Sequence, residues 1–162
     1  MIEPPCPLHE SHDISRFDCG VEALNTYLKQ YAQQAQKRDG ARTYVVRKDN
    51  LVVAYYTIVF GSIVWNAAPD NVRKGLGKYP IPVMIVARLA VDKRWADRGL
   101  GNSLLLDALQ KAVTASEIAG LRAVIVDAKD DLAKAFYERR GFRPWPVGSN
   151  RLFVTLPELK KK

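Results

Sequence analysis

The chain has 162 residues, of which 48% are hydrophobic and 26% are charged, a balance typical of one folded domain. Lysine and arginine number 25 against 17 acidic residues, and the net charge of +8 favours anionic partners such as nucleic acid or phosphorylated cofactors. The two cysteines and two histidines form no metal-ligand or disulfide pattern. The longest apolar run, Leu51 to Phe60, is too short to span a membrane, and no signal peptide is recognisable. We therefore expect one cytoplasmic domain over residues 1–162, without metal or membrane contact.

The first half of the chain predicts helices followed by a hairpin. Ser11–Phe17 suits a short helix, and Gly20–Arg38 suits a longer one with apolar residues at three- and four-residue spacing. Residues 42–47 and 51–66 have the composition of two strands joined by a short turn. Ala67–Pro82 is rich in proline and glycine, so we expect an exposed loop there.

The second half predicts strands alternating with helices. The expected order is a strand over 83–91, a helix from Gly99-Leu-Gly101 to about 118, a strand over 121–126, a helix from Asp130 or Asp131 to 140, and strands over 142–145 and 150–156. In the later helix Leu132, Ala135 and Phe136 share an apolar stripe, with Tyr137 about 100° round from Phe136, at its margin. This order predicts an α/β (α+β) fold.

Two glycines stand between the strand and the helix, in Arg98-Gly-Leu-Gly-Asn-Ser103. A helix N-terminus preceded by small residues offers unpaired N–H groups and a partial positive charge, which suit a phosphate or pyrophosphate. A Walker loop would require Gly-Lys-Ser/Thr, and a dinucleotide fingerprint would require a third glycine where Leu104 stands. Taken alone, the glycines also fit a tight turn with no ligand.

The stretches before and after the glycine motif make it more specific. Gly99-Leu-Gly101 after a strand ending Leu89-Ala-Val-Asp92, followed by Ala133-Lys-Ala-Phe-Tyr-Glu-Arg-Arg-Gly-Phe142, resembles the acyl-coenzyme A core of the GNAT acetyltransferase superfamily. The resemblance implies the GNAT fold, with a mixed central sheet of about six to seven strands, a splay between the cofactor strands, and about four flanking helices. It also implies acetyl-CoA as the cofactor. Leu89 and Val91 would then contact pantetheine, and the pyrophosphate would be held by Arg98, Gly99, Leu100, Gly101, Asn102 and Ser103.

The same resemblance gives Tyr137 the role of proton donor to the departing thiolate, although a helical tyrosine more often packs in a core. The chain departs from the family pattern at two positions. Ala96 replaces the usual Gln or Arg before the first glycine, and Asp130 replaces a frequent Asn, so a cofactor contact of Asp130 is a candidate only. No Glu or His in the strand motifs offers a general base. This favours an acceptor whose pKa is near neutral, such as an α-amino group near 7.7 rather than a lysine near 10.4.

Further stretches resemble the acetyltransferase toxins of bacterial toxin-antitoxin pairs. They are Phe17-Asp-Cys-Gly20, Leu24-Asn-Thr-Tyr-Leu28, Ala41-Arg-Thr-Tyr-Val-Val46, Pro82 to Asp92 and Leu152-Phe-Val-Thr-Leu-Pro157. This resemblance implies acetylation of the α-amino group of aminoacyl-tRNA, inhibition of translation, a small ribbon-helix-helix antitoxin and a possible homodimer. The rival hypotheses are a housekeeping N-acetyltransferase acting on a protein N-terminus or small amine, and a non-catalytic coenzyme A-binding module.

A tRNA substrate requires cations that contact phosphates. Arg88, a charge within an apolar strand, is the candidate for a contact near the reacting end, and a paired structural arginine is the alternative. The other candidate tRNA contacts are Lys29, Lys37, Arg38, Arg42, Arg47, Arg73, Lys74 and Lys78.

Overall fold

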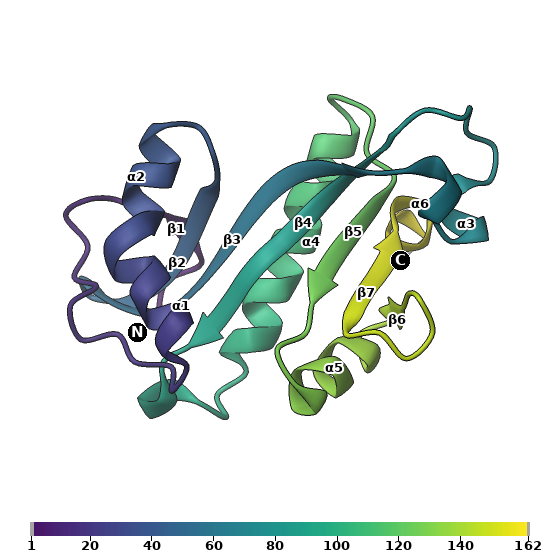
Figure 1. The fold of residues 1–162 in the computed structure, drawn as a ribbon. Coiled ribbons are helices and arrows are strands. Elements are labelled where there is room, and N and C mark those ends of the chain that lie inside the picture. Colours follow the sequence, from purple (N-terminus) through teal and green to yellow (C-terminus); the bar gives the residue numbers. More distant parts are fainter. Residues whose placement is uncertain (1, 162) are drawn as a thin grey trace. The chain divides into compact units, whose positions relative to one another are not determined.

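The computed structural model describes residues 2–161, whose strands form a seven-stranded mixed sheet in the order β1-β2-β3-β4-β5-β7-β6 (Figure 1). The strands are β1 (Cys6–Pro7), β2 (Arg42–Lys48), β3 (Leu51–Ile63), β4 (Ile81–Val91), β5 (Ala123–Asp127), β6 (Arg143–Pro144) and β7 (Arg151–Thr155). The helices are α1 (Glu22–Thr26), α2 (Ala32–Lys37), α3 (Asp70–Arg73), α4 (Leu100–Ser116), α5 (Asp131–Glu138) and α6 (Leu156–Lys160).

The chain divides into two compact units. Unit one comprises Met1–Val59 and Ala87–Ala108, and unit two comprises Phe60–Val86 and Leu109–Lys162. Three elements, β3, β4 and α4, run through both units. A single domain over residues 1–162 stays a prediction.

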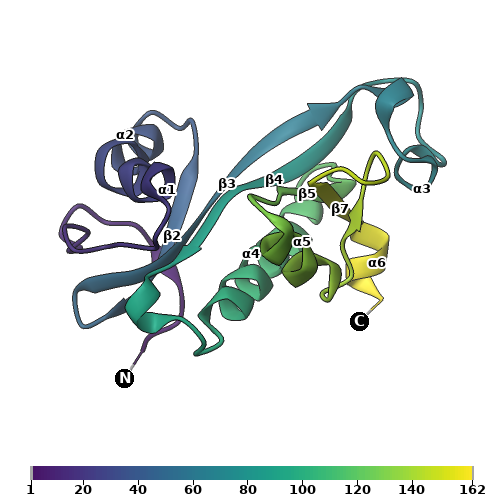
Figure 2. The same ribbon diagram turned by 60° about the horizontal axis from the view of Figure 1, so that its bottom comes forward.

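In unit one, the β2–β3 hairpin supports the N-terminal helices. The two strands pair antiparallel from Arg42 with Ile58 to Lys48 with Leu51, which confirms the expected hairpin. Leu28, from the helical segment, and Tyr55, from β3, belong to one buried cluster, so the helices cover a face of this hairpin (Figures 1 and 2).

The helix expected over Ser11–Phe17 is wrong. The segment forms turns, in which the Asp13 carboxylate accepts hydrogen bonds from both the main-chain N–H and the hydroxyl of Ser15, at 3.0 and 2.6 Å. His12 Nδ1 likewise accepts the N–H of His9 at 3.0 Å. Such side-chain acceptors compete with helical hydrogen bonds, and they hold the segment in a non-helical path.

The longer helix over Gly20–Arg38 is present but not uniform. Helices α1 and α2 are joined by a π-helical turn at Tyr27–Tyr31, and Tyr31 departs from helical geometry, with φ −122°. The Tyr55 hydroxyl donates a hydrogen bond to the Leu24 carbonyl at 2.7 Å. Counting α1 to α2 as one helix gives five α-helices within residues 2–161, where the resemblance implied about four.

In unit two, β5 lies between a parallel and an antiparallel neighbour. It pairs with β4 from Val83–Ala123 to Val86–Val126, and with β7 along its whole length. Strand β4 continues to Val91, beyond its last residue paired with β5, as the splay implied by the resemblance requires. The later strands and the helices α4 and α5 confirm the expected order, whereas the short α6 was not expected.

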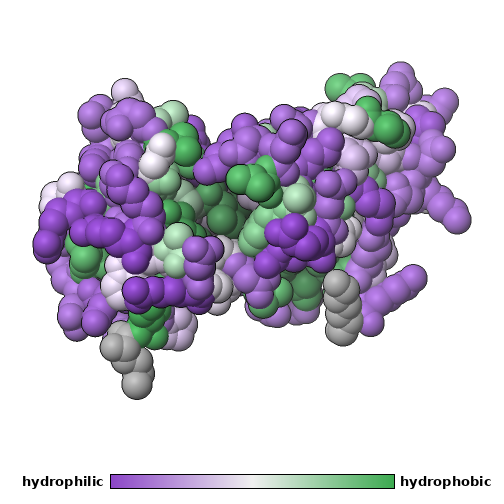
Figure 3. All heavy atoms as spheres, turned by 90° about the horizontal axis from the view of Figure 1, so that it is seen from below, coloured by the Kyte–Doolittle hydropathy of each residue, from purple (hydrophilic) through white to green (hydrophobic). Residues whose placement is uncertain are grey.

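The loop expected over Ala67–Pro82 is a structured segment. It contains α3 and the first residues of β4, and Val72 is fully buried in a cluster with Ile81 and Phe153. The surface in view in Figure 3 is largely hydrophilic, with apolar side chains in small patches. None of the helices within residues 2–161 has the length and apolarity that a membrane span needs.

Candidate functional site

A buried carboxylate fixes the chain where β4 ends. Asp92 is fully buried and accepts hydrogen bonds from the main-chain N–H groups of Asp18 and Arg94, at 3.1 and 2.9 Å. The Arg94 guanidinium donates two more, at 3.0 and 2.9 Å. Burial raises the pKa of Asp92, but the hydrogen bonds from Arg94 and Asp18 outweigh it and leave the pKa below its usual value. Sequence analysis missed this clamp; an aspartate at a strand end with an arginine two residues later was its only signal.

The glycine turn that follows positions the start of α4. Gly99 has φ +78°, a left-handed conformation that favours glycine, and a Cβ there would meet no atom within 4 Å, so the backbone rather than space explains the glycine. The Ser103 N–H donates to the Gly99 carbonyl at 3.1 Å. The N–H groups of Leu100 and Gly101 precede this first helical bond and therefore lie at the positive end of the helix dipole.

This end of unit one fits a phosphorylated ligand. The exposed Arg98 guanidinium lies 4.4 Å from the centroid of the Trp95 ring, which places a cation directly before Gly99. Leu89 and Val91 are half-buried on the part of β4 beyond its pairing with β5. Thus unit one carries a strand end, an exposed cation and a helix N-terminus in succession, as a pantetheine and pyrophosphate would need.

Tyr137, in unit two, is more buried than its place on the helical wheel predicts. It is 7% exposed, and its ring makes edge-on contacts with Phe136 and Phe142 at centroid distances of 5.2 and 5.7 Å. Leu132, expected in the buried stripe, is 83% exposed. The apolar stripe predicted for α5 is therefore wrong, because Tyr137 rather than Leu132 faces the core.

The Tyr137 hydroxyl is available as a donor. Burial raises the pKa of Tyr137 to about 12, and its hydroxyl makes no hydrogen bond with any group of residues 2–161. Asp130, by contrast, is occupied, because its carboxylate caps α5 by accepting the Ala133 N–H at 2.8 Å. Its side chain is exposed, and a contact of Asp130 with a cofactor stays a prediction.

Arg88 has an aromatic partner rather than an acidic one. Its guanidinium lies 3.6 Å from the centroid of the Tyr27 ring, within the distance of a cation–π contact. No carboxylate of residues 2–161 forms an ion pair with it. Arg88 is therefore held by an aromatic ring, and its contact with tRNA stays a prediction. Tyr27, which lies in the π-helical turn, was not singled out by sequence analysis.

Three basic residues of the first hairpin and helix have acidic partners. Lys37 pairs with Glu10 at 3.5 Å, Arg42 with Asp39 at 3.3 Å, and Arg47 with Glu3 at 2.8 Å. Two others, Lys29 and Arg38, are exposed and form no ion pair within residues 2–161.

A second group of candidates lies in unit two. Arg73 pairs with Asp70 at 2.7 Å, and both Arg73 and Lys78 approach the ring of Trp65. Lys74 is exposed. The structure thus assigns the candidate site residues to both units, with Arg88, Leu89, Val91 and the glycine turn in unit one and Asp130 and Tyr137 in unit two.

Comparison with known proteins identifies the family of the chain. Residues 39–144 match the acetyltransferase (GNAT) domain family. The chain is 34% identical over 156 residues to the tRNA-acetylating toxin of Mycobacterium tuberculosis, covering 96% of this chain and 93% of the relative. It superposes on AtaT complexed with acetyl-methionyl-tRNAfMet with a TM-score of 0.91 and 26% identity, covering 99% and 98% of the two chains. A mutant of the AtaT toxin, bound to the C-terminus of the antitoxin AtaR and acetyl-CoA, gives a TM-score of 0.84 and 26% identity, covering 99% and 97%. The chain has the expected fold and belongs to the GNAT acetyltransferase family.

Proposed function

We propose that the protein is the toxin of a type II toxin-antitoxin pair, which transfers acetyl from acetyl-CoA to the α-amino group of aminoacyl-tRNA and so inhibits translation. The observation that carries this proposal is the similarity to the tRNA-acetylating toxin over 96% of the chain. That similarity extends beyond residues 39–144, the part that matches the general acetyltransferase family, into the segments outside the catalytic core.

Unit one binds acetyl-CoA, which supplies the activated acetyl group. The main chain at Leu89 and Val91 pairs with pantetheine, and the N–H groups at the start of α4 bind the pyrophosphate. Arg98, together with Asn102 and Ser103, adds side-chain donors at the same turn. The Asp92 clamp joins the end of β4 to Asp18 in the N-terminal segment and to Arg94 in the chain that follows β4.

Tyr137 donates to the sulfur of coenzyme A as the thioester bond breaks. With a pKa of about 12, its hydroxyl is protonated at neutral pH. A thiol has a pKa near 8.5, so complete proton transfer from such a phenol to a thiolate is uphill. The hydroxyl therefore acts chiefly through the hydrogen bond that it offers to the developing negative charge. Within residues 2–161 the hydroxyl makes no protein hydrogen bond that would have to break first.

The acceptor amine needs no protein base if it is already neutral. An α-amino group has a pKa near 7.7, and a nearby cation lowers an amine pKa further because like charges disfavour the protonated form. Arg88, held against Tyr27 and without an acidic partner, supplies such a cation near the reacting end. The proton released from the amine after attack passes to solvent.

The partner that restrains the toxin is a small ribbon-helix-helix antitoxin, and a homodimer is the proposed assembly. One relative, AtaT, is bound to the C-terminus of its antitoxin AtaR, which supports an antitoxin here. Since charged tRNA is found in the cytoplasm, the protein acts there.

Cell-free translation tests this proposal. The purified protein should stop synthesis only when acetyl-CoA is present, and an added antitoxin from the neighbouring gene should restore it. A housekeeping acetyltransferase or a non-catalytic coenzyme A-binding module would leave translation running with or without acetyl-CoA, and that result would overturn the toxin assignment.

A further inference from the structure

We propose that the segment between β3 and β4 is a built phosphate-binding surface for the RNA backbone. We call it the Trp65 platform and define it by Trp65, Arg73, Lys74 and Lys78. This inference rests on the proposed function, because it takes RNA to be the substrate. It distinguishes these residues from the other basic candidates and assigns a part to Trp65, which sequence analysis did not consider.

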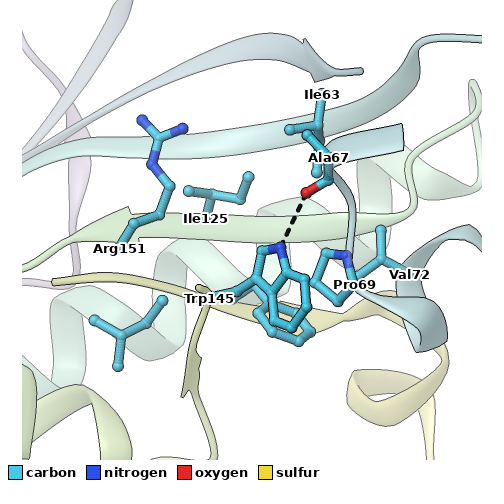
Figure 4. Close-up of a pocket in the computed structure, with 9 residues that line it drawn as sticks. Ile63, Ala67, Pro69, Val72, Ile125, Trp145 and Arg151 are labelled. Carbon is cyan, nitrogen blue, oxygen red and sulfur yellow. Dashed lines mark hydrogen bonds between the residues drawn. The ribbon is translucent and has the colours of Figure 1, made fainter. Parts of the chain in front are cut away.

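The backbone of the platform is held from two directions. The Trp145 indole donates to the Ala67 carbonyl at 2.9 Å, and both residues line a small apolar pocket together with Pro69 and Val72 (Figure 4). The Arg122 guanidinium donates to the carbonyls of Val72, Asn71 and Lys74, at 2.7, 3.0 and 3.3 Å. These anchors place the platform's cations on a fixed scaffold rather than on a free loop.

Trp65 holds two cations without neutralising them. The Arg73 guanidinium lies 4.8 Å and the Lys78 ammonium 5.4 Å from the centroid of its ring. A cation–π contact orients a charged side chain while leaving its charge in place, so both cations stay able to attract an anion. Trp65 itself packs against the buried cluster of unit two, which gives the pair a firm support.

The ion pair between the platform and a carboxylate is weak. Arg73 pairs with Asp70, but the Asp70 side chain is 92% exposed. An ion pair this exposed contributes at most about 1 kcal/mol, so a phosphate can replace the carboxylate. Lys74 and Lys78 form no ion pair within residues 2–161. Lys37, Arg42 and Arg47 pair with carboxylates that are also exposed, so the platform differs from them by its anchored backbone and the Trp65 ring rather than by the absence of ion pairs.

A hollow beside these cations has room for a sugar–phosphate unit. It has a volume of about 510 Å³ and is lined by Trp65, Asp70, Asn71, Arg73, Lys74, Gly75 and Leu76. Lysines and an arginine fork match the repeated phosphates of an RNA strand, and the proposed tRNA substrate makes RNA, rather than an acidic peptide, the expected occupant.

Salt dependence of tRNA binding tests the platform. The double variant Lys74→Gln, Lys78→Gln removes two expected phosphate contacts, and each contact contributes about 0.9 to the slope of log K against log salt on a duplex. We expect the slope to fall by about 1.8 and affinity to fall about 30-fold at 0.15 M salt. The matched control is Lys160→Gln, Lys161→Gln, which makes the same charge change at exposed positions of the chain end and should alter the slope little.

Two further measurements separate this inference from the proposed function. The platform variant should bind acetyl-CoA as the parent does and raise KM for charged tRNA without lowering kcat. Trp65→Leu, which removes no charge, should also weaken tRNA binding. Trp65→Phe should bind tRNA nearly as the parent does, because an aromatic ring is retained. Equal slopes for the platform and control variants, with the parent acetylating charged tRNA, would overturn the platform and leave the proposed function standing. A parent that acetylates no charged tRNA would instead overturn the proposed function.

Discussion

Tyr137→Phe removes only the hydroxyl oxygen and keeps the aromatic ring, whose packing the structure shows. The ring packs against Phe136 and Phe142, and phenylalanine retains both contacts. Because the hydroxyl bonds to no group of residues 2–161, its removal leaves no protein donor or acceptor unpaired. We therefore expect the free energy of unfolding to change by less than about 0.5 kcal/mol.

The same substitution should affect the chemical step strongly. A positioned hydrogen-bond donor to a developing negative charge contributes about 10²- to 10³-fold to a rate, which corresponds to about 2.7–4 kcal/mol of transition-state stabilisation. Single-turnover transfer of labelled acetyl to charged tRNA, at saturating acetyl-CoA, measures this step, and calorimetry measures the affinity for coenzyme A. The rate should fall at least about 100-fold while affinity and melting temperature are preserved.

The pH dependence of the transfer rate is a second test of the Tyr137 hydroxyl. A donor with a raised pKa of about 12 keeps its proton below that value, so the parent enzyme should show no alkaline loss of rate up to pH values near 10. A Tyr137→Phe variant that transfers acetyl within threefold of the parent rate would refute the role of the hydroxyl. A large drop in melting temperature would instead show that the hydroxyl has a structural partner.

Three other predictions follow from the same geometry. Asp92→Asn should destabilise the fold by about 1–3 kcal/mol because it breaks buried charge-assisted hydrogen bonds, whereas Asp127→Asn at an exposed pair should cost at most about 1 kcal/mol, and thermal melts compare the two. The hydrogen bond from Arg143 lowers the pKa of Glu158 from 4.5 to about 2, so its stabilisation is present above pH 4.5 and is lost as the pH falls toward 2. Urea unfolding should show that the free energy of unfolding differs less between pH 6 and pH 3 for Glu158→Gln than for the parent. An equal difference in the two proteins would contradict this. Gly99→Val should strain the turn by about 1–2 kcal/mol and weaken acetyl-CoA binding about 5- to 30-fold, so an unchanged affinity would exclude a role for the turn.

Local patterns predicted the elements whose signals agree with their packing. The hairpin around Asp49 and the glycine turn before α4 each combine a strong turn residue with a regular apolar period. For these elements propensity and tertiary structure favour the same conformation, so sequence alone was sufficient.

Elsewhere, contacts distant in sequence decided the structure. The segment Ser11–Phe17 has helical composition, yet side-chain acceptors and a bridge from Asp13 to Leu51 on β3 prevent a helix. Arg122, about 50 residues away, holds the carbonyls around α3 in a stretch whose prolines and glycines predicted only a loop. Neither partner is visible in the local sequence.

The candidate site was predicted as residue types and not as geometry. The glycine motif identified the turn, but the clamp at Asp92 and the stacking of Arg88 on Tyr27 depend on side chains that meet only in the fold. The burial of Tyr137 is a similar case, since a helical wheel placed it at the margin of the apolar face and Phe142 lies on the chain beyond the helix.

The central claim is most directly tested by locating the acetyl group. Labelled acetyl-CoA is incubated with the purified protein and total charged tRNA, the aminoacyl ester is released by mild base, and the amino acids are separated. We predict label on the α-amino group of one or a few amino acids and none on uncharged tRNA. Label that appears only on protein N-termini or small amines, with charged tRNA left unmodified, would contradict the account.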